Sequence, residues 1–272
     1  LAIRCLKNKD YVIAIHNLKT GMQQFYDCKM GSLQPSFSPD DRLLFYEEDH
    51  DQVRVIHTDT GKQASELLSL GKQLSVGAFS RDGSEIYLSY NSDQIGRWSL
   101  ESNALIDPII QPGGTISNLK HAPHEDQIAT AASDGILRCW RTSGSPKLLW
   151  KTKKLGQITK IEYSNSGEWI ATATASGNIA LWNSSNGQKL EIDLPHDDQV
   201  FHFQFTPEDQ VLMTVTANHL IHFWNPLSGL SISEPLAWEG LWQSVTLSID
   251  GKLFSRTLAN GQVEIRPTPG TG

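Results

Sequence analysis

Cysteine is scarce in this chain of 272 residues, and its scarcity excludes two kinds of site. The three cysteines are Cys5, Cys28 and Cys139, and no two of them have the Cys-x-x-Cys spacing. An odd number at these distances gives neither a disulfide framework nor a four-ligand zinc site. We therefore expect a reducing compartment, with the cytoplasm as the localisation.

Excess positive charge and long apolar runs are also missing. The formal net charge is -7, and the sequence contains no long block of Lys or Arg residues. We therefore expect neither nucleic acid nor a membrane surface as a partner. No segment approaches the ~18 apolar residues of a membrane span. The start, Leu1–Cys5, has neither Met nor a signal-peptide layout, so we expect the chain to be part of a longer polypeptide.

The sequence lacks the short motifs of three common enzyme classes. It has no phosphate loop ending in Gly-Lys-Ser or Gly-Lys-Thr, no HExxH zinc helix and no GxSxG nucleophile elbow. His219 and His222 have an HxxH spacing, but residues three apart on a strand point to opposite faces. Paired acids such as Asp40-Asp41 and Asp197-Asp198 fall at turns, where solvated carboxylates are the ordinary interpretation. We expect no catalysis, no metal and no cofactor.

What the sequence does contain is a strict internal repeat. A string of an apolar residue, a small residue and a turn pair recurs at residues 37, 79, 121, 163, 205 and 247, so that every interval is 42 residues. A period between 20 and 50 residues is typical of repeat folds. The frame reaches these residues nineteen positions after each start: Ile56, Trp98, Trp140, Trp182, Trp224 and Arg266. We interpret the tryptophans as structural.

Each repeat unit reads as four short antiparallel strands. Residues 169–174 alternate with period two, and a tight turn separates them from residues 179–182. A sheet of this size cannot bury both faces alone, whereas radial stacking buries a continuous core. We therefore predict one all-β domain over residues 1–272, a seven-bladed β-propeller of four-stranded antiparallel blades with incomplete first and last blades. The units start near residues 1, 31, 73, 115, 157, 199 and 241, and residues upstream of Leu1 are expected to supply the missing outer strand.

These signatures resemble the WD-repeat family of β-propellers. The Phe-Ser-Pro-Asp-Gly-like and Leu-Trp-Asn-like strings recur over roughly residues 4–266. The chain departs from the family because no tryptophan is followed by Asp and no Gly-His dipeptide occurs. Of the family's network of His, Ser or Thr, Asp and Trp, we expect only the unit with Thr130, Asp134 and Trp140 to retain three members. Strand pairing and apolar packing should hold the other blades together.

The resemblance implies that a partner docks on the wide face, where the inner strands start. Short polar or amide side chains dominate there, and they suit recognition rather than acid or base chemistry. The candidate partner-binding residues are Leu33, Gln73, Ser75, Thr115, Ser117, Gln157, Thr159, Gln199, Phe201, Leu241 and Gln243. Phe201 and Leu241, with Trp242, Trp238 and Leu236, form a candidate aromatic patch. We expect Trp242 to be core and Phe201 to contact the partner.

We therefore expect a non-catalytic scaffold that binds a protein or peptide within a larger multidomain protein, with its oligomeric state open. One alternative is a channel-site enzyme or small-ligand binder of the propeller hydrolase, lactonase or quinoprotein type. A second is a regulatory domain attached to a kinase or nucleotide-switch ATPase, as the resemblance suggests for bacterial and fungal signalling proteins. A third is an architectural member of a longer array of repeats.

Overall fold

The structure is all-β in the part of the chain that it describes. It is a computed structural model, and it describes residues 2–7, 10–16, 23–29, 33–71, 74–237, 242–248, 250–258 and 263–270. The strands of these residues form seven separate sheets with antiparallel pairing. The predicted all-β, antiparallel fold class is confirmed.

The chain divides into two compact units, which are residues 1–134 with 140–148 and residues 135–139 with 149–272. The first unit contains a sheet of β1 (Ala2–Lys7), β2 (Asp10–His16) and β3 (Gln23–Asp27). Its second sheet has β4 (Ser36–Phe37), β5 (Leu43–Asp49), β6 (Gln52–His57) and β7 (Leu68–Ser69). Its third has β8 (Leu74–Phe79), β9 (Glu85–Tyr90), β10 (Gln94–Ser99) and β11 (Ala104–Ile110).

A fourth sheet contributes residues to both units. It consists of β12 (Ile116–His121), β13 (Gln127–Ala132), β14 (Leu137–Arg141) and β15 (Lys147–Lys151). The second unit continues with β16 (Ile158–Tyr163), β17 (Trp169–Thr174) and β18 (Ile179–Asn183). Next come β19 (Val200–Phe205), β20 (Leu212–Thr216), β21 (Leu220–Trp224) and β22 (Leu236–Ala237). The last sheet has β23 (Trp242–Leu247), β24 (Leu253–Leu258) and β25 (Val263–Pro267).

Not every sheet has the four strands that the repeat predicts. Among the described residues the first and last sheets have three strands, and so does the sheet β16–β18. In that sheet Lys189 meets Trp182 through one isolated bridge. The Ile192 N–H then binds the Leu190 carbonyl, which turns the chain after this single bridge. The four-strand prediction therefore fails for this unit.

The recurring string is a turn signature rather than a site. In four of the units its serine hydroxyl accepts the N–H of the residue five positions later, at 2.9 to 3.1 Å. These pairs are Ser38 with Leu43, Ser80 with Glu85, Ser164 with Trp169, and Ser248 with Leu253. Gly83 and Asp41 adopt positive φ angles of 73° and 59° in two of these turns. The string therefore ends the first strand of the six sheets that follow β1–β3 and reverses the chain.

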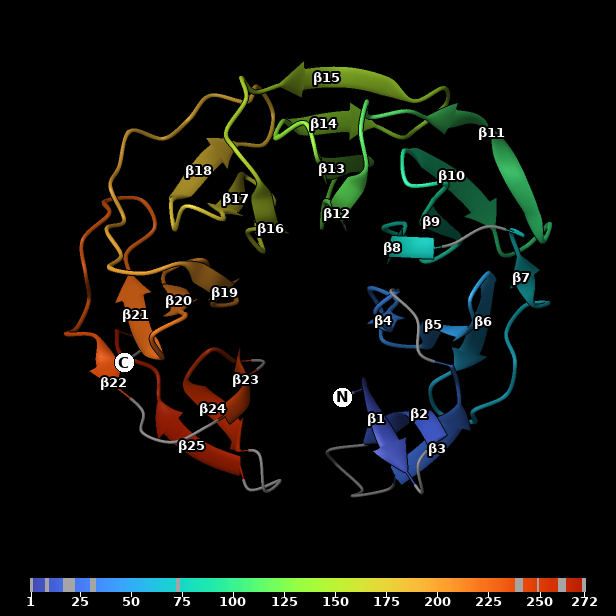
Figure 1. The fold of residues 1–272 in the computed structure, drawn as a ribbon, viewed down its shortest axis with the longest axis horizontal. Coiled ribbons are helices and arrows are strands. Elements are labelled where there is room, and N and C mark those ends of the chain that lie inside the picture. The colour runs from blue at the N-terminus through green and yellow to red at the C-terminus, as the bar shows by residue number, and fades with distance from the viewer. Residues whose placement is uncertain are drawn as a thin grey trace. The chain divides into compact units, whose positions relative to one another are not determined.

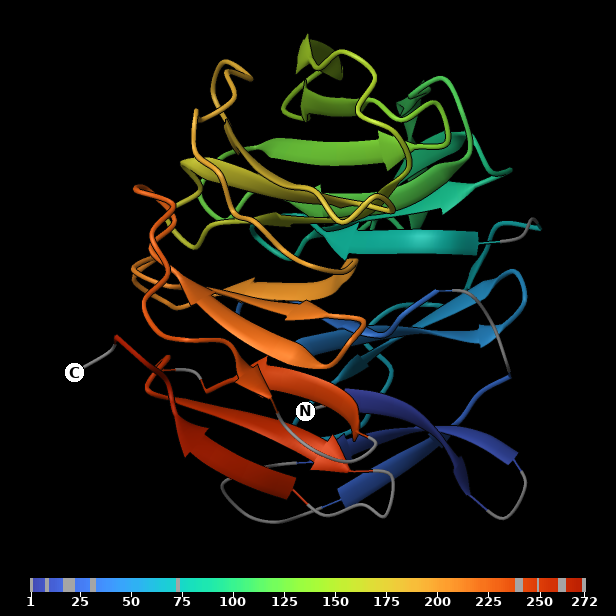
Figure 2. The same ribbon diagram turned by 60° about the vertical axis from the view of Figure 1, so that its left-hand side comes forward.

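The core lies between the faces of neighbouring sheets. In the first unit β4 and β12 both lie beside β8, and in the second unit β16 and β23 both lie beside β19 (Figure 1). Figure 2 shows the sheets β19–β22 and β23–β25 stacked face to face. Phe223 and Phe254 fill that interface with ring centroids 5.1 Å apart. Sheet stacking thus buries the apolar face of each unit.

Candidate functional site

A β-bulge recurs in the first strand of five sheets, at the positions where the sequence predicts partner contacts. The register shifts between Ile116 and Asn118, between Ile158 and Lys160, and between Val200 and His202. Related shifts occur in β8 and β23. A bulge leaves one residue unpaired and re-aims its side chain. The residues at these shifts, which we call the bulge positions, are Ser75, Ser117, Thr159, Phe201 and Gln243.

Hydroxyl side chains at three bulge positions bond within their own sheet. Ser117 Oγ donates to the Ala131 carbonyl and Thr159 Oγ1 to the Ala173 carbonyl, each at 3.3 Å. Ser75 Oγ lies 2.9 Å from Ser89 Oγ. In each case the partner is fourteen residues further along the chain, on the adjacent strand. These side chains therefore stabilise the bulge.

Phe201 departs from this pattern because a phenyl ring cannot replace the hydroxyl. Its side chain is 45% exposed, while the neighbouring Val200 and Phe203 are fully buried. The ring therefore presents apolar surface to solvent at a position where the fold itself accepts Ser or Thr. An exposed aromatic ring suits a contact with a partner.

The structure places the other predicted contact residues unevenly. Thr115 and Gln157 are exposed and Gln199 is half-buried. Leu33 is fully buried in the core with Phe45 and Leu74, so the expectation that it contacts a partner is corrected: its side chain fills the space between two sheets.

Several predictions lie outside the described residues. Gln73, Leu241 and Trp238 are not described, and neither are the side chains of Trp242 and Gln243 on β23. Leu236 is half-buried and packs against the core cluster of Phe223 and Phe254. Within the candidate aromatic patch, Phe201 is therefore the described residue whose aromatic ring is exposed.

Three of the repeat tryptophans donate to a threonine ten residues earlier. Trp140 Nε1 binds Thr130 Oγ1, Trp182 Nε1 binds Thr172 Oγ1 and Trp224 Nε1 binds Thr214 Oγ1, each at 3.0 Å. Trp98 has Leu88 at the equivalent position, and its indole nitrogen is buried with no hydrogen-bond partner in the described part of the chain. Asp134, which the sequence predicts as the third network member beside Thr130 and Trp140, is half-buried in the turn after β13.

The sheet β19–β22 corrects the expectation that only the unit with Thr130 keeps three network members. His196 Nε2 lies 2.7 Å from Thr214 Oγ1, and His196 Nδ1 lies 2.7 Å from the Leu194 carbonyl. Because a carbonyl only accepts, Nδ1 carries the proton, and the Thr214 hydroxyl donates to Nε2. His196, Thr214 and Trp224 therefore form a connected chain of hydrogen bonds. The sequence does not reveal this chain of bonds through the family's Gly-His dipeptide, because His196 follows Pro195.

Burial controls the electrostatics of this network. The His196 ring packs edge-on against His222, with centroids 4.9 Å apart, and His222 stacks on Trp224 at 5.7 Å. Desolvation, together with the neighbouring His222, lowers the pKa of His196 to about 4. Desolvation also lowers the pKa of His222. Both imidazoles are therefore neutral near pH 7, as a structural role requires.

The described residues hold neither a metal-ion cluster nor a membrane-spanning helix. They contain no group of three or more His, Cys, Asp or Glu side chains placed to hold a metal ion. They also contain no helix long and apolar enough to span a membrane.

Comparison with known proteins agrees with this architecture. Residues 119–206 match the family model of the anaphase-promoting complex subunit 4 WD40 domain. The chain resembles the crystal structure of the Myceliophteria thermophila Cps50 (Swd1) beta-propeller domain, with a TM-score of 0.78 and 13% identity. That likeness covers 95% of this chain and 91% of that chain. The fold is a β-propeller. No curated protein sequence gives a match.

The predicted β-propeller fold agrees with the solved structure, and the resemblance to WD repeats agrees with the family model over residues 119–206. Binding of other proteins is typical of WD-repeat propellers. An identity of 13% establishes the fold alone, so the propeller's own partner must be argued from its side chains.

Proposed function

We propose that this β-propeller is a non-catalytic protein-interaction module of a larger protein. A protein or peptide binds it at the ends of the first strands, where the bulge positions lie. The observation that carries the proposal is the exposed ring of Phe201, which occupies a position where Ser or Thr would stabilise the bulge. The matched WD40 family model takes its name from a subunit of a complex, which agrees with such a role.

The proposal includes a ring of seven blades whose last blade takes an outer strand from residues upstream of Leu1. Its support is the exposure of Val263 and Ile265 on β25, at 57% and 62%. The residues equivalent to Val263 in five other units are at most 8% exposed: Val53, Ile95, Leu137, Ile179 and Ile221. Val53 and Ile221 pair with Leu68 of β7 and Leu236 of β22, so a fourth strand covers them.

Replacing Phe201 with Thr, the residue at the equivalent position of β16, tests the proposed function. Thr159 shows that the fold accepts this side chain, so we expect an unchanged melting temperature. Proteins that the wild type captures from an extract of its own cells, identified by mass spectrometry, should be lost with the variant. Capture of the same proteins at the same yield would contradict the proposal. A Lys147→Ala variant, at an exposed position on β15 that is not among the candidate contact residues, serves as the control.

A further inference from the structure

A hollow of about 570 Å³ lies in the second unit, at the opposite ends of the strands from Phe201. Its walls come from the sheets β16–β18 and β19–β22 and from Gly270 near the end of the chain. Val200 at the start of β19 pairs with Thr216, whereas Phe205 at its far end pairs with Leu212 and lines the hollow. The hollow is thus separate from the bulge positions. Its volume is within the range of ligand pockets, about 300 to 1,000 Å³.

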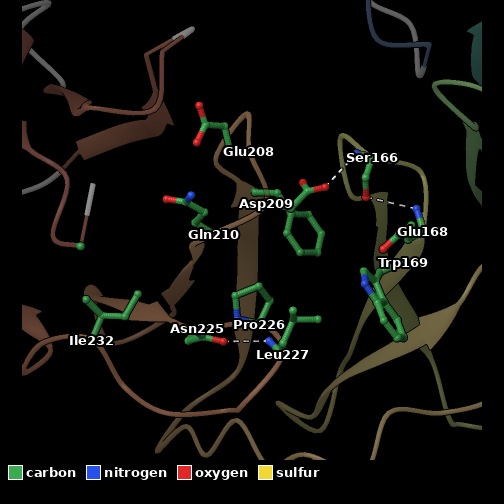
Figure 3. A pocket seen from close by; sticks show the side chains of 12 residues that line it. Ser166, Glu168, Trp169, Glu208, Asp209, Gln210, Asn225, Pro226, Leu227 and Ile232 are labelled. Carbon is green, nitrogen blue, oxygen red and sulfur yellow. Dashed lines mark hydrogen bonds between the residues drawn. The ribbon is translucent and has the colours of Figure 1, made fainter. Parts of the chain in front are cut away.

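Apolar and aromatic groups line the hollow on two opposite sides and between them (Figure 3). Phe205 and Pro226 are buried, Trp169 and Ile232 are half-buried, and Leu227 is 60% exposed. Figure 3 shows Trp169 and Ile232 on opposite sides of the hollow, with Pro226 and Leu227 between them. The hollow can therefore remove a large apolar side chain from water.

The exposed Leu227 is not needed for the turn in which it lies. At the equivalent positions of the four preceding units the sequence has Asp59, Glu101, Ser143 and Ser185. These four residues are polar. The turns of Asp59 and Ser185 also share the backbone of the Leu227 turn, because the glycine two residues later has a positive φ of 68° to 72° in all three: Gly61, Gly187 and Gly229. The fold therefore tolerates Ser at position 227, and the leucine adds apolar surface to the rim.

The polar rim of the hollow is acidic. Glu168, Glu208 and Asp209 line it, and its twelve lining residues include no Lys, Arg or His. Asp209 accepts the N–H groups of Asn165 and Ser166 at 2.7 Å, which fixes its carboxylate at the edge (Figure 3). Glu168 and Glu208 are exposed and form no ion pair within the described residues. A cation held here would meet these carboxylates and the π face of Trp169.

We propose that this hollow binds a short segment of a partner protein in which an arginine or lysine lies close to a leucine-like side chain. The aliphatic side chain enters between Trp169, Phe205 and Leu227, and the cation lies at the rim beside Glu168 and Glu208. This inference deepens the proposed protein-interaction function and rests on it, but it assigns a second surface and a partner chemistry.

The probe is a set of fluorescein-labelled ten-residue peptides in a Gly/Ser background, with one Arg placed one to four residues from one Leu. Matched peptides carry Glu in place of Arg. Anisotropy titration should show at least one Arg peptide binding about fivefold or more tightly than its Glu counterpart, with a difference that shrinks in high salt. Leu227→Ser should weaken that peptide about tenfold or more, because an apolar contact is lost. The double variant Glu168→Gln, Glu208→Gln should abolish the preference for Arg over Glu.

Ile265→Ser is the matched control, because Ile265 is 62% exposed on β25 and does not line the hollow. It should leave the affinity unchanged, and thermal melting checks that each variant is folded. Failure of every Arg peptide to bind, or binding that Leu227→Ser leaves intact, would overturn the inference. If Phe201→Thr removes peptide binding and Leu227→Ser does not, the peptide site is wrong while the proposed function stands.

Discussion

At the scale of single residues, Thr214 shows how one hydroxyl group joins two buried rings. It accepts the indole N–H of Trp224 and donates to the neutral imidazole of His196. Thr130 and Thr172 occupy the equivalent position in two other sheets. Each accepts the indole N–H of its tryptophan, and neither has an equivalent bond to a histidine in the described structure. The hydrogen-bond chain is therefore specific to the sheet β19–β22, and it depends on an unprotonated His196 Nε2.

Protonation of His196 places two donors on the Thr214 hydroxyl, so acid should weaken the fold. The pKa of His196 is about 4 in the folded chain, below the ordinary value of 6.5, so the unfolded chain binds the proton more readily. The stability that His196 contributes is complete above pH 6.5 and is lost as the pH falls to about 4.

Urea unfolding between pH 7 and pH 4 checks this expectation. The free energy of unfolding of the wild type should fall more steeply than that of His196→Gln, by on the order of 1 kcal/mol after allowance for partial exposure. His50→Gln, which changes an exposed histidine, should follow the wild type. Parallel curves for wild type and His196→Gln would show that the network does not depend on the proton.

At the scale of the element, two equivalent valines on the third strands of two sheets differ in exposure, and one of them lies beside a fourth strand. Val53 on β6 is fully buried because Leu68 of β7 pairs beside it. Val263 has the same place in its unit, yet it is 57% exposed on β25. The two valines thus have one sequence context and two environments.

The substitution Val→Thr measures this difference at both positions. Val53→Thr buries a hydroxyl in the core and should cost about 1 to 3 kcal/mol. Val263→Thr in the 272-residue chain should change stability by no more than about 0.5 kcal/mol. Denaturant unfolding of both variants gives the comparison, and equal losses would show that β25 is already covered. In a longer polypeptide that supplies the proposed outer strand, the cost of Val263→Thr should rise to that of Val53→Thr.

At the scale of the whole molecule, stability is distributed over stacked sheets. Within each compact unit neighbouring sheets pack on one another, so a defect should spread first within its own unit. Phe203 is fully buried in the cluster that joins β17 and β18 to β19 and β20. We expect Phe203→Ala to cost about 3 to 5 kcal/mol.

Hydrogen exchange followed by mass spectrometry locates that loss. Amides of β17–β21 in the second unit should exchange much faster in Phe203→Ala than in the wild type. Amides of β5 and β6 in the first unit should change least. Uniform acceleration along the chain would instead indicate that the propeller unfolds as one cooperative block.

The sequence by itself determined the repeat, the antiparallel strands and the propeller fold, because alternation and turn residues recur at one spacing of 42 residues. It also led to Phe201 from that frame. The tertiary structure decided which side chains are reachable: Leu33 is buried between sheets, while the bulge at position 201 leaves a ring exposed. It also decided that His196 forms a hydrogen bond with Thr214 and that Leu227 and Trp169 line the same hollow. Local periodicity fixes strands, but contacts between residues many positions apart depend on how neighbouring sheets pack.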